Sequence, residues 1–221
     1  MSDIEKRQLP VWQESILLVI TAMIMAVVVK AFFLQAFYIP SESMEPTMLV
    51  DDKILVQKVS YWGGEADRGD IVVFDDPGGW LNAAESRQAN NPVQRGLEVI
   101  GLFPTGGHLI KRVVGVGGDK VKCCDSSGHI TVNGTPLDEP YLLDASVNPN
   151  QTFDVVVPKD HLWVMGDNRA NSADSRMHMG DPGGGFIDTG AVVGKAWVRV
   201  WPISRWDVLR SPDTFDVVQA R

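Results

Sequence analysis

Two serines lie two positions apart in YIPSESMEPTM, residues 38–48, and each could act as a nucleophile. Ser41 and Ser43 stand between Pro40 and Pro46, so the segment is expected to form a rigid turn that presents two hydroxyls. A serine attacks a carbonyl near neutral pH only when a neighbouring base takes its proton. Histidine is the usual base, but no G-x-S-x-G motif or recognisable triad context accompanies the four histidines. These are His108, His129, His161 and His178.

A lysine is the other base that the sequence offers. In HLIKRVVG, residues 108–115, strand alternation places Lys111 on the same face as Leu109 and Val113. An apolar face removes water from an ammonium group and lowers its pKa from about 10.4, which favours the neutral amine that a base must be. An exposed lysine on an edge strand is the alternative for an isolated residue of this type.

A third polar group lies in MGDNRANSADSR, residues 165–176, where aspartates, arginines and serines are concentrated in one loop. One interpretation is a solvated turn, for which Asn, Asp and Ser are the common residues. The other is a fixed ion-pair scaffold whose hydroxyls support a neighbouring amine. The sequence leaves both interpretations open.

The N-terminal segment carries the apolar run ILLVITAMIMAVVV, residues 16–29, and apolar residues continue beyond Lys30. Residues 15–37 together are long enough for one transmembrane helix. No small-x-small cleavage site follows, which favours a retained anchor over a cleaved signal peptide, and a buried helix is a third option. Lys6 and Arg7 precede the run, so the positive-inside rule predicts a cytoplasmic tail over residues 1–14. Residues 38–221 are then expected outside the cell membrane.

The chain after residue 50 is rich in short apolar runs and turn residues, which favours an antiparallel β-domain. Strands are expected in 52–59, 70–74, 108–121, 129–137, 153–168 and 190–203. Residues 75–107 are expected to form a long loop excursion. Three late tryptophans are expected to pack in the core: Trp197, Trp201 and Trp206.

Composition excludes some classes of function. The formal net charge of −8 argues against nucleic acid as a partner, because a phosphate backbone would be repelled. The two cysteines are adjacent, at Cys123 and Cys124, so they cannot build a four-ligand zinc site. Adjacent cysteines close a disulfide only with strain, which favours two thiols.

Four motifs in order resemble the type I signal peptidases, the membrane-bound serine proteases that remove secretory signal peptides. They are PSESMEPTM (40–48), RGDIVVF (68–74), KRVVGVGGD (111–119) and GDNRANSADSR (166–176). With the N-terminal anchor, the resemblance covers nearly the whole chain. The adjacent cysteines and the GVGGD sequence resemble the actinobacterial branch of the family.

The resemblance implies roles for the hydroxyls and the lysine. Ser43 matches the nucleophile and Lys111 the general base. Ser41 matches the serine whose hydroxyl forms the oxyanion hole together with the backbone N–H of Ser43. Ser172 matches a serine that is hydrogen-bonded to the base lysine.

The resemblance also implies supporting and substrate-binding residues. Asp174 and Arg176 match an ion pair that braces the loop, and Asp167 belongs to the same scaffold. Residues at three further positions match those that line shallow pockets for small side chains: Phe37, Ile39 and Ile110.

The fold implied is mainly β: coiled antiparallel sheets or a partly closed barrel, with an irregular cap over about residues 120–160 and one transmembrane helix. The implied substrates are preprotein signal peptides, bound extended with small residues at the first and third positions before the cut. No cofactor or metal is implied, and the lipid bilayer is the expected surroundings. The alternative is a membrane-tethered β-domain that binds exported peptides or a partner without cleaving them.

Overall fold

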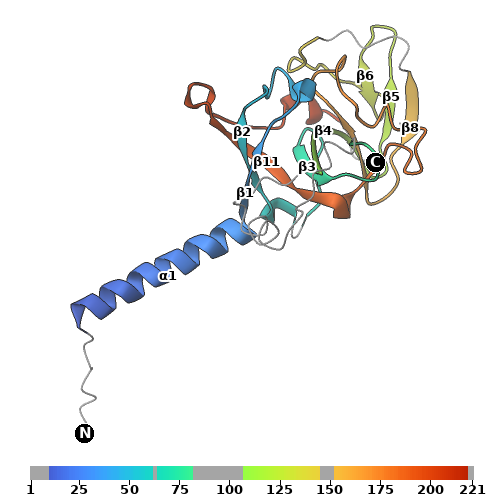
Figure 1. Cartoon of the computed structure of the whole chain (residues 1–221). Coiled ribbons are helices and arrows are strands. Elements are labelled where there is room, and N and C mark those ends of the chain that lie inside the picture. The colour runs from blue at the N-terminus through green and yellow to red at the C-terminus, as the bar shows by residue number, and fades with distance from the viewer. Residues whose placement is uncertain (1–9, 62–63, 82–106, 145–151, 219–221) are drawn as a thin grey trace.

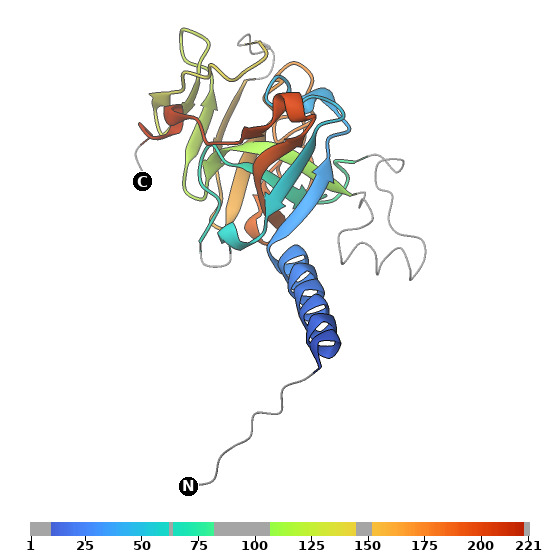
Figure 2. The same ribbon diagram turned by 90° about the vertical axis from the view of Figure 1, so that its left-hand side faces the viewer.

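The computed structural model describes residues 10–61, 64–81, 107–144 and 152–218 of the 221-residue chain. One helix, α1 (Val11–Phe32), leads into a β-domain and extends away from it (Figures 1 and 2). Within the described residues, no helix combines the length and the apolar character needed to cross a membrane.

The large sheet is antiparallel and runs in the order β1-β2-β11-β3-β4-β9-β10, with β12 paired to β11. Its strands are β1 (Leu34–Tyr38), β2 (Lys53–Gln57), β3 (Ile71–Asp75), β4 (His108–Val116), β9 (His161–Met165), β10 (Ile187–Asp188), β11 (Val192–Trp201) and β12 (Asp207–Val208). Among the described strands this order does not close on itself, so the sheet is open where a partly closed barrel was expected.

The small sheet is also antiparallel, in the order β7-β6-β5-β8. Its strands are β5 (Lys120–Cys123), β6 (Ile130–Val132), β7 (Thr135–Pro136) and β8 (Phe153–Val156). It occupies the region expected to be an irregular cap, which is therefore more regular than the sequence indicates. The turn at Asn133-Gly134 joins β6 to β7, with both residues at positive φ, as Asn-Gly hairpins require.

Five short 3-10 turns occur among the described residues, four between strands and one after the last strand. They are η1 (Glu42–Met44), η2 (Val59–Tyr61), η3 (Thr189–Ala191), η4 (Ile203–Arg205) and η5 (Asp213–Phe215). The first of them, η1, carries the two-serine motif and comes directly after β1.

The predicted helix boundaries were wrong at the C-terminal end. The sequence favoured one helix over residues 15–37, whereas α1 ends at Phe32 and residues Leu34–Tyr38 form β1. This segment pairs antiparallel with β2, from Leu34 opposite Gln57 to Tyr38 opposite Lys53. A short apolar run fits a helix or a strand equally well, and the partner strand supplies the backbone hydrogen bonds that decide between them.

Two other predictions were corrected. The sulfurs of Cys123 and Cys124 are bonded as a disulfide, whereas two thiols were favoured. Trp197, Trp201 and Trp206 are exposed rather than buried, because β11 directs Trp197 to its solvent side and the other two lie at or beyond its end. Most of the expected excursion, residues 82–106 of 75–107, lies outside the described residues.

Apolar side chains pack on both faces of the large sheet. One cluster gathers around the two-serine turn and includes Ile39, Met44, Ile54 and Ile110. On the other face a second cluster packs around Phe74. A third joins the small sheet to Trp163 and Met165 of β9. The end of β9 is therefore fixed from two sides, and the loop of residues 165–176, which we call the polar loop, begins at that point.

Candidate active site

Ser43 lies in the η1 turn and is 8% exposed. The turn is closed by the N–H of Glu45, which donates to the carbonyl of Glu42 at 3.1 Å. Met44 and Met48 are fully buried beneath it, and the Met48 N–H donates to the Met44 carbonyl at 2.9 Å. Apolar burial on one side of the turn therefore fixes the direction of the neighbouring hydroxyl.

Lys111 lies on β4 and is 4% exposed. Its Nζ donates to Ser43 Oγ at 2.7 Å and to the Ile110 carbonyl at 3.0 Å. The two side chains are 68 positions apart in the sequence, and the fold brings them into direct contact. This is the geometry required of a serine nucleophile and its base.

Burial changes the protonation of Lys111. Loss of water around the amine lowers the pKa of Lys111 from 10.5 to about 8, while the carboxylates of Asp174 and Asp167 oppose the shift. The lowered pKa supplies a neutral amine in a useful fraction of molecules near neutral pH. The amine can then accept the Ser43 proton.

Ser41 lies beside Ser43. Its Oγ is 3.3 Å from Ser43 Oγ, and Ser41 itself is exposed. An exposed hydroxyl this close to Ser43 Oγ could donate a hydrogen bond to a bound carbonyl oxygen. The oxyanion-hole role of Ser41 stays a prediction.

The polar loop is a fixed scaffold and not a solvated turn. Asp174 is buried and holds Arg176 through two hydrogen bonds of 2.8 Å, and it also accepts the Gly166 N–H at 3.0 Å. Burial alone would raise the pKa of Asp174, but Arg176 and the backbone donor hold it below its ordinary value. Asp174 therefore remains a carboxylate.

Asp167 fixes the start of the same loop. It accepts two hydrogen bonds from Arg112, at 2.6 and 2.8 Å, and one from Thr47 Oγ1 at 2.5 Å. Arg112 and Asp167 are both buried. The pair therefore connects β4, the polar loop and the segment that follows Ser43.

Ser172 lies close to Ser43, but in this structure it is not hydrogen-bonded to Lys111. Its Oγ is buried and makes no hydrogen bond of standard geometry with any described residue. It lies near Gly166 and the Ser43 carbonyl, and it contributes to the low pKa of Asp174. The expected hydrogen bond from Ser172 to Lys111 is therefore not present in this structure, and the supporting role of Ser172 stays a prediction.

The three residues expected to line pockets lie together on one side of the site. Ile39 and Ile110 are buried in the cluster beneath Ser43, and Phe37 packs against that cluster. The ring of Phe37 also meets His108 edge-on, with a centroid separation of 5.4 Å. Their role toward substrate stays a prediction.

Comparison with known proteins adds an independent observation. The family described as "Signal peptidase, peptidase S26" matches residues 12–201. The chain belongs to this signal peptidase family. The family predicted from the four motifs is thereby confirmed.

Individual members of the signal peptidase family show how similar the chain is. A probable signal peptidase I of Mycobacterium leprae (strain TN) is 40% identical over 232 residues, covering 91% of this chain and 80% of that protein. A signal peptidase I of Mycobacterium tuberculosis (strain ATCC 25618 / H37Rv) is 41% identical over 223 residues, covering 90% and 76%. A crystal structure of a signal peptidase I from Enterococcus faecalis V583 is 27% identical, with a TM-score of 0.37, and covers 59% of this chain and 96% of that one.

Several supporting residues were missed by sequence reasoning. Arg169 is buried and forms an ion pair with Glu139 at 2.6 Å, and Tyr141 donates to Glu139 at the same distance. The Arg112 guanidinium lies 4.3 Å from the centroid of the Tyr141 ring. Two signals were present in the sequence: Arg169 falls within GDNRANSADSR, and Arg112 falls within KRVVGVGGD on the strand face opposite Lys111. Nothing in the sequence indicated Glu139 or Tyr141.

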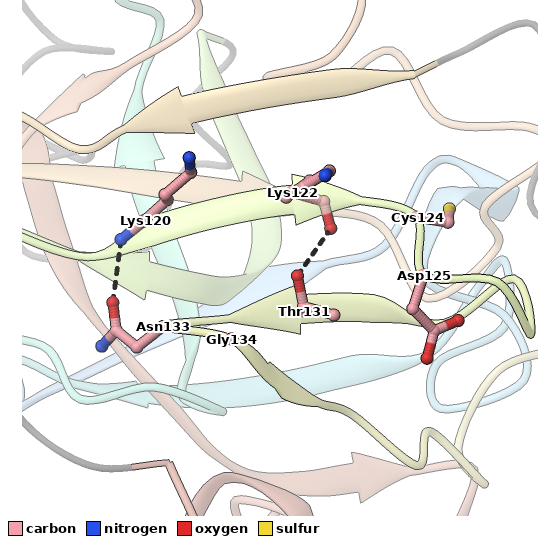
Figure 3. A pocket seen from close by; sticks show the side chains of 7 residues that line it. All are labelled: Lys120, Lys122, Cys124, Asp125, Thr131, Asn133 and Gly134. Atoms are coloured by element: carbon pink, nitrogen blue, oxygen red, sulfur yellow. Dashed lines mark hydrogen bonds between the residues drawn. The ribbon is translucent and has the colours of Figure 1, made fainter.

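A separate pocket of about 340 Å³ lies on the outer side of the small sheet (Figure 3). Lys120, Lys122 and Cys124 are among its lining residues, and the backbone N–H of Lys120 donates to Asn133 Oδ1 at 2.9 Å. Its lining contains none of the residues of the Ser43–Lys111 site. Within the described ranges, no group of three or more His, Cys, Asp or Glu side chains is arranged to hold a metal ion.

Proposed function

We propose that this protein is a membrane-bound serine endopeptidase that removes N-terminal signal peptides from exported preproteins after small-x-small sites. The observation that carries the proposal is the 2.7 Å contact between Lys111 Nζ and Ser43 Oγ, formed by two buried side chains. Membership of the signal peptidase family supports the same reaction.

The first step forms an acyl-enzyme. Neutral Lys111 takes the proton from Ser43 Oγ, which attacks the scissile carbonyl. The carbonyl oxygen becomes an oxyanion, stabilised by Ser41 Oγ and the Ser43 N–H. One such donor is commonly worth about 3 to 4 kcal/mol in the transition state. The protonated lysine then gives its proton to the leaving amine, which departs as the new N-terminus of the mature protein.

The second step releases the enzyme. Lys111 is neutral again and takes a proton from a water molecule, which attacks the acyl carbon. The ester bond between the acyl group and Ser43 Oγ breaks, and Lys111 returns to Ser43 Oγ the proton that it took from water. The steps require only Ser41, Ser43, Lys111 and water, and we propose that no metal or cofactor takes part.

The strands beside the site leave room for an extended substrate. Among the described strands, β1 pairs only with β2, and residues 108–111 of β4 pair only with β3. Each therefore keeps a free edge next to Ser43 or Lys111. A peptide added as a strand would gain backbone hydrogen bonds there, and alternate side chains would face the apolar cluster.

The cluster would account for selection of small residues. Phe37, Ile39 and Ile110 pack together beside Ser43, and we propose that they line shallow apolar recesses that accept alanine at the first and third positions before the cut. A larger side chain would collide with these packed residues, so selection acts largely by exclusion.

The membrane part of the proposal rests on exposed apolar surface. Residues such as Trp12, Leu18 and Met25 of α1 are each at least 60% exposed, on a helix that stands apart from the β-domain (Figure 1). Trp201 and Trp206 are also more than half exposed. The described helix does not by itself meet the length and apolar character of a membrane span. On the strength of its exposed apolar side chains we nevertheless propose that α1 anchors the protein in the plasma membrane in a single pass, with residues 1–14 cytoplasmic and the catalytic domain outside.

One assay separates this function from a membrane-tethered domain that only binds peptides. Purified protein in detergent is incubated with a preprotein that contains an Ala-x-Ala site. Wild type should cleave it. The substitutions Ser43→Ala and Lys111→Met should each lower the cleavage rate by about 10³-fold or more. Exposed matched controls, Ser127→Ala and Lys122→Met, should retain it. If wild type cleaves no faster than Ser43→Ala, the enzymatic proposal is wrong.

A further inference from the structure

Two arginines from the C-terminal part of the chain hold the segment that follows the nucleophile. Arg199, on β11, donates from Nη1 to the Thr47 carbonyl and from Nε to the Arg205 carbonyl. Arg205, in η4, donates from Nη1 to both carboxylate oxygens of Asp52, at 2.8 and 2.9 Å. Its Nη2 also reaches the Pro46 carbonyl at 3.5 Å. We call Arg199 and Arg205 the arginine clamp.

The clamp holds the serine segment on the C-terminal side of Ser43, and Asp52 connects it to the other end. Asp52 is 1% exposed and accepts the Leu49 N–H at 2.8 Å, and its own carbonyl accepts the Ile39 N–H at 2.9 Å. The chain thus leaves the sheet at Ile39 and returns to it at Asp52. The intervening residues carry both active-site serines and are fixed at Thr47 and at Asp52.

The sheet is shaped to aim Arg199 at this segment. The pairing of β11 with β2 shifts register between Ala196 and Val198 and again between Arg199 and Trp201. Such bulges bend a strand and redirect a side chain. Arg199 is 9% exposed, so its guanidinium lies within the domain and not over the surface.

The charges in the clamp argue for a geometric role. Burial, and then the nearby positive charge of Arg205, lower the pKa of Arg199, while Asp52 and Asp207 act in the opposite direction. Two like charges close together cost free energy, and apolar residues of similar volume often stabilise a fold as well or better. Arginine, however, offers several donors in a fixed plane and can hold two carbonyls at once.

We propose that Arg199 and Arg205 are positioning residues that keep Ser43 Oγ within hydrogen-bond distance of Lys111 Nζ. The inference rests on the proposed peptidase function. Thr47, held by Arg199 through its carbonyl, also donates through Oγ1 to Asp167, which is bonded to Arg112 beside the base. Loss of the clamp would let the nucleophile move relative to β4, and a displacement of about 1 Å can cost about 10²-fold in rate.

The test compares Arg199→Met, Arg199→Lys and Arg205→Met with an exposed control, Arg210→Met. Cleavage of an Ala-x-Ala preprotein is measured well below each melting temperature, and rates are expressed per folded molecule. For the methionine variants we expect kcat to fall about tenfold or more, with KM within about twofold of wild type. Arg199→Lys keeps the charge and one donor and should recover part of the rate. The control should match wild type.

Other outcomes overturn the inference. A folded variant that keeps the wild-type kcat and only melts earlier would show that the clamp is purely structural. A raised KM with unchanged kcat would assign the arginines to substrate binding. If a methionine variant does not fold, Arg199→Lys and Arg205→Gln give the same comparison with smaller changes. Failure of wild type to cleave would instead refute the proposed function.

Discussion

Burial of Lys111 Nζ favours the neutral amine that the proposed reaction needs. With a pKa of about 8, about one molecule in ten carries the neutral amine at pH 7, against about one in three thousand for an ordinary lysine. The cluster of apolar side chains around the site therefore raises the supply of active base by more than two orders of magnitude. The same burial must destabilise the fold whenever the amine is charged.

That cost predicts that Lys111→Met is inactive but more stable. The pKa falls from 10.5 when unfolded to about 8 when folded, so the unfolded chain binds more protons between these values. The penalty is therefore complete below pH 8, shrinks as pH rises, and disappears above 10.5. Lys111→Met should gain up to about 3 kcal/mol at pH 7, measured by denaturant unfolding at pH 7 and at pH 10. A variant less stable than wild type at pH 7 would contradict the account.

Gly166 is a second residue at which geometry leaves little choice. A Cβ there would collide with the Ser172 side chain and with the backbone carbonyl of Ser43. Gly166→Ala should therefore push the polar loop away from the nucleophile and reduce kcat by about 10²-fold. Gly180→Ala is the matched control, since a Cβ at that position meets nothing within 4 Å. Equal cleavage rates for the two variants would show that close approach at Gly166 is unimportant.

Between elements, the small sheet is tied to the polar loop by one buried ion pair. Arg169 and Glu139 are 0% and 6% exposed, and the residues after β7 supply Glu139. Glu139→Gln leaves Arg169 buried without a charge partner and should destabilise the protein by about 3 to 5 kcal/mol. Asp154→Asn is the control, because its pair with Lys120 is exposed and should be worth at most about 1 kcal/mol. Thermal unfolding measures the stability of both variants. An equal loss of stability in the two would show that the Arg169–Glu139 pair does not hold the small sheet to the polar loop.

Most strands could be predicted from alternation and turn residues. Motif order singled out Ser43 and Lys111, which the structure brings into contact, and their catalytic roles stay a prediction. The boundary at residues 33–38 could not be predicted, because β1 exists only through its pairing with β2. Contacts between distant elements could not be predicted either. Nothing in the sequence around Glu139 indicates its contact with the polar loop, and nothing around Arg199 indicates its contact with Thr47. Such contacts depend on tertiary packing between segments 30 to 152 positions apart.

For the whole molecule, α1 extends away from the β-domain (Figure 2), and many of its described apolar side chains are exposed. All the described strands begin after residue 32, so removing residues 1–32 leaves them intact. We expect the full chain to stay in the membrane pellet after alkaline extraction and the shortened chain to appear in the supernatant. The shortened chain should still cleave a soluble Ala-x-Ala peptide. Release of the full chain by alkali would contradict membrane anchoring.

The pH dependence of kcat/KM tests the central claim most directly, because it reports the protonation of the free enzyme's base. Wild type is assayed on a peptide without titratable groups near the cut. The value of kcat/KM should increase as pH rises, with an apparent pKa of about 8, the value to which burial lowers the pKa of Lys111. An apparent pKa near 10.5, or a kcat/KM that does not change with pH across this range, would show that neutral Lys111 is not the base.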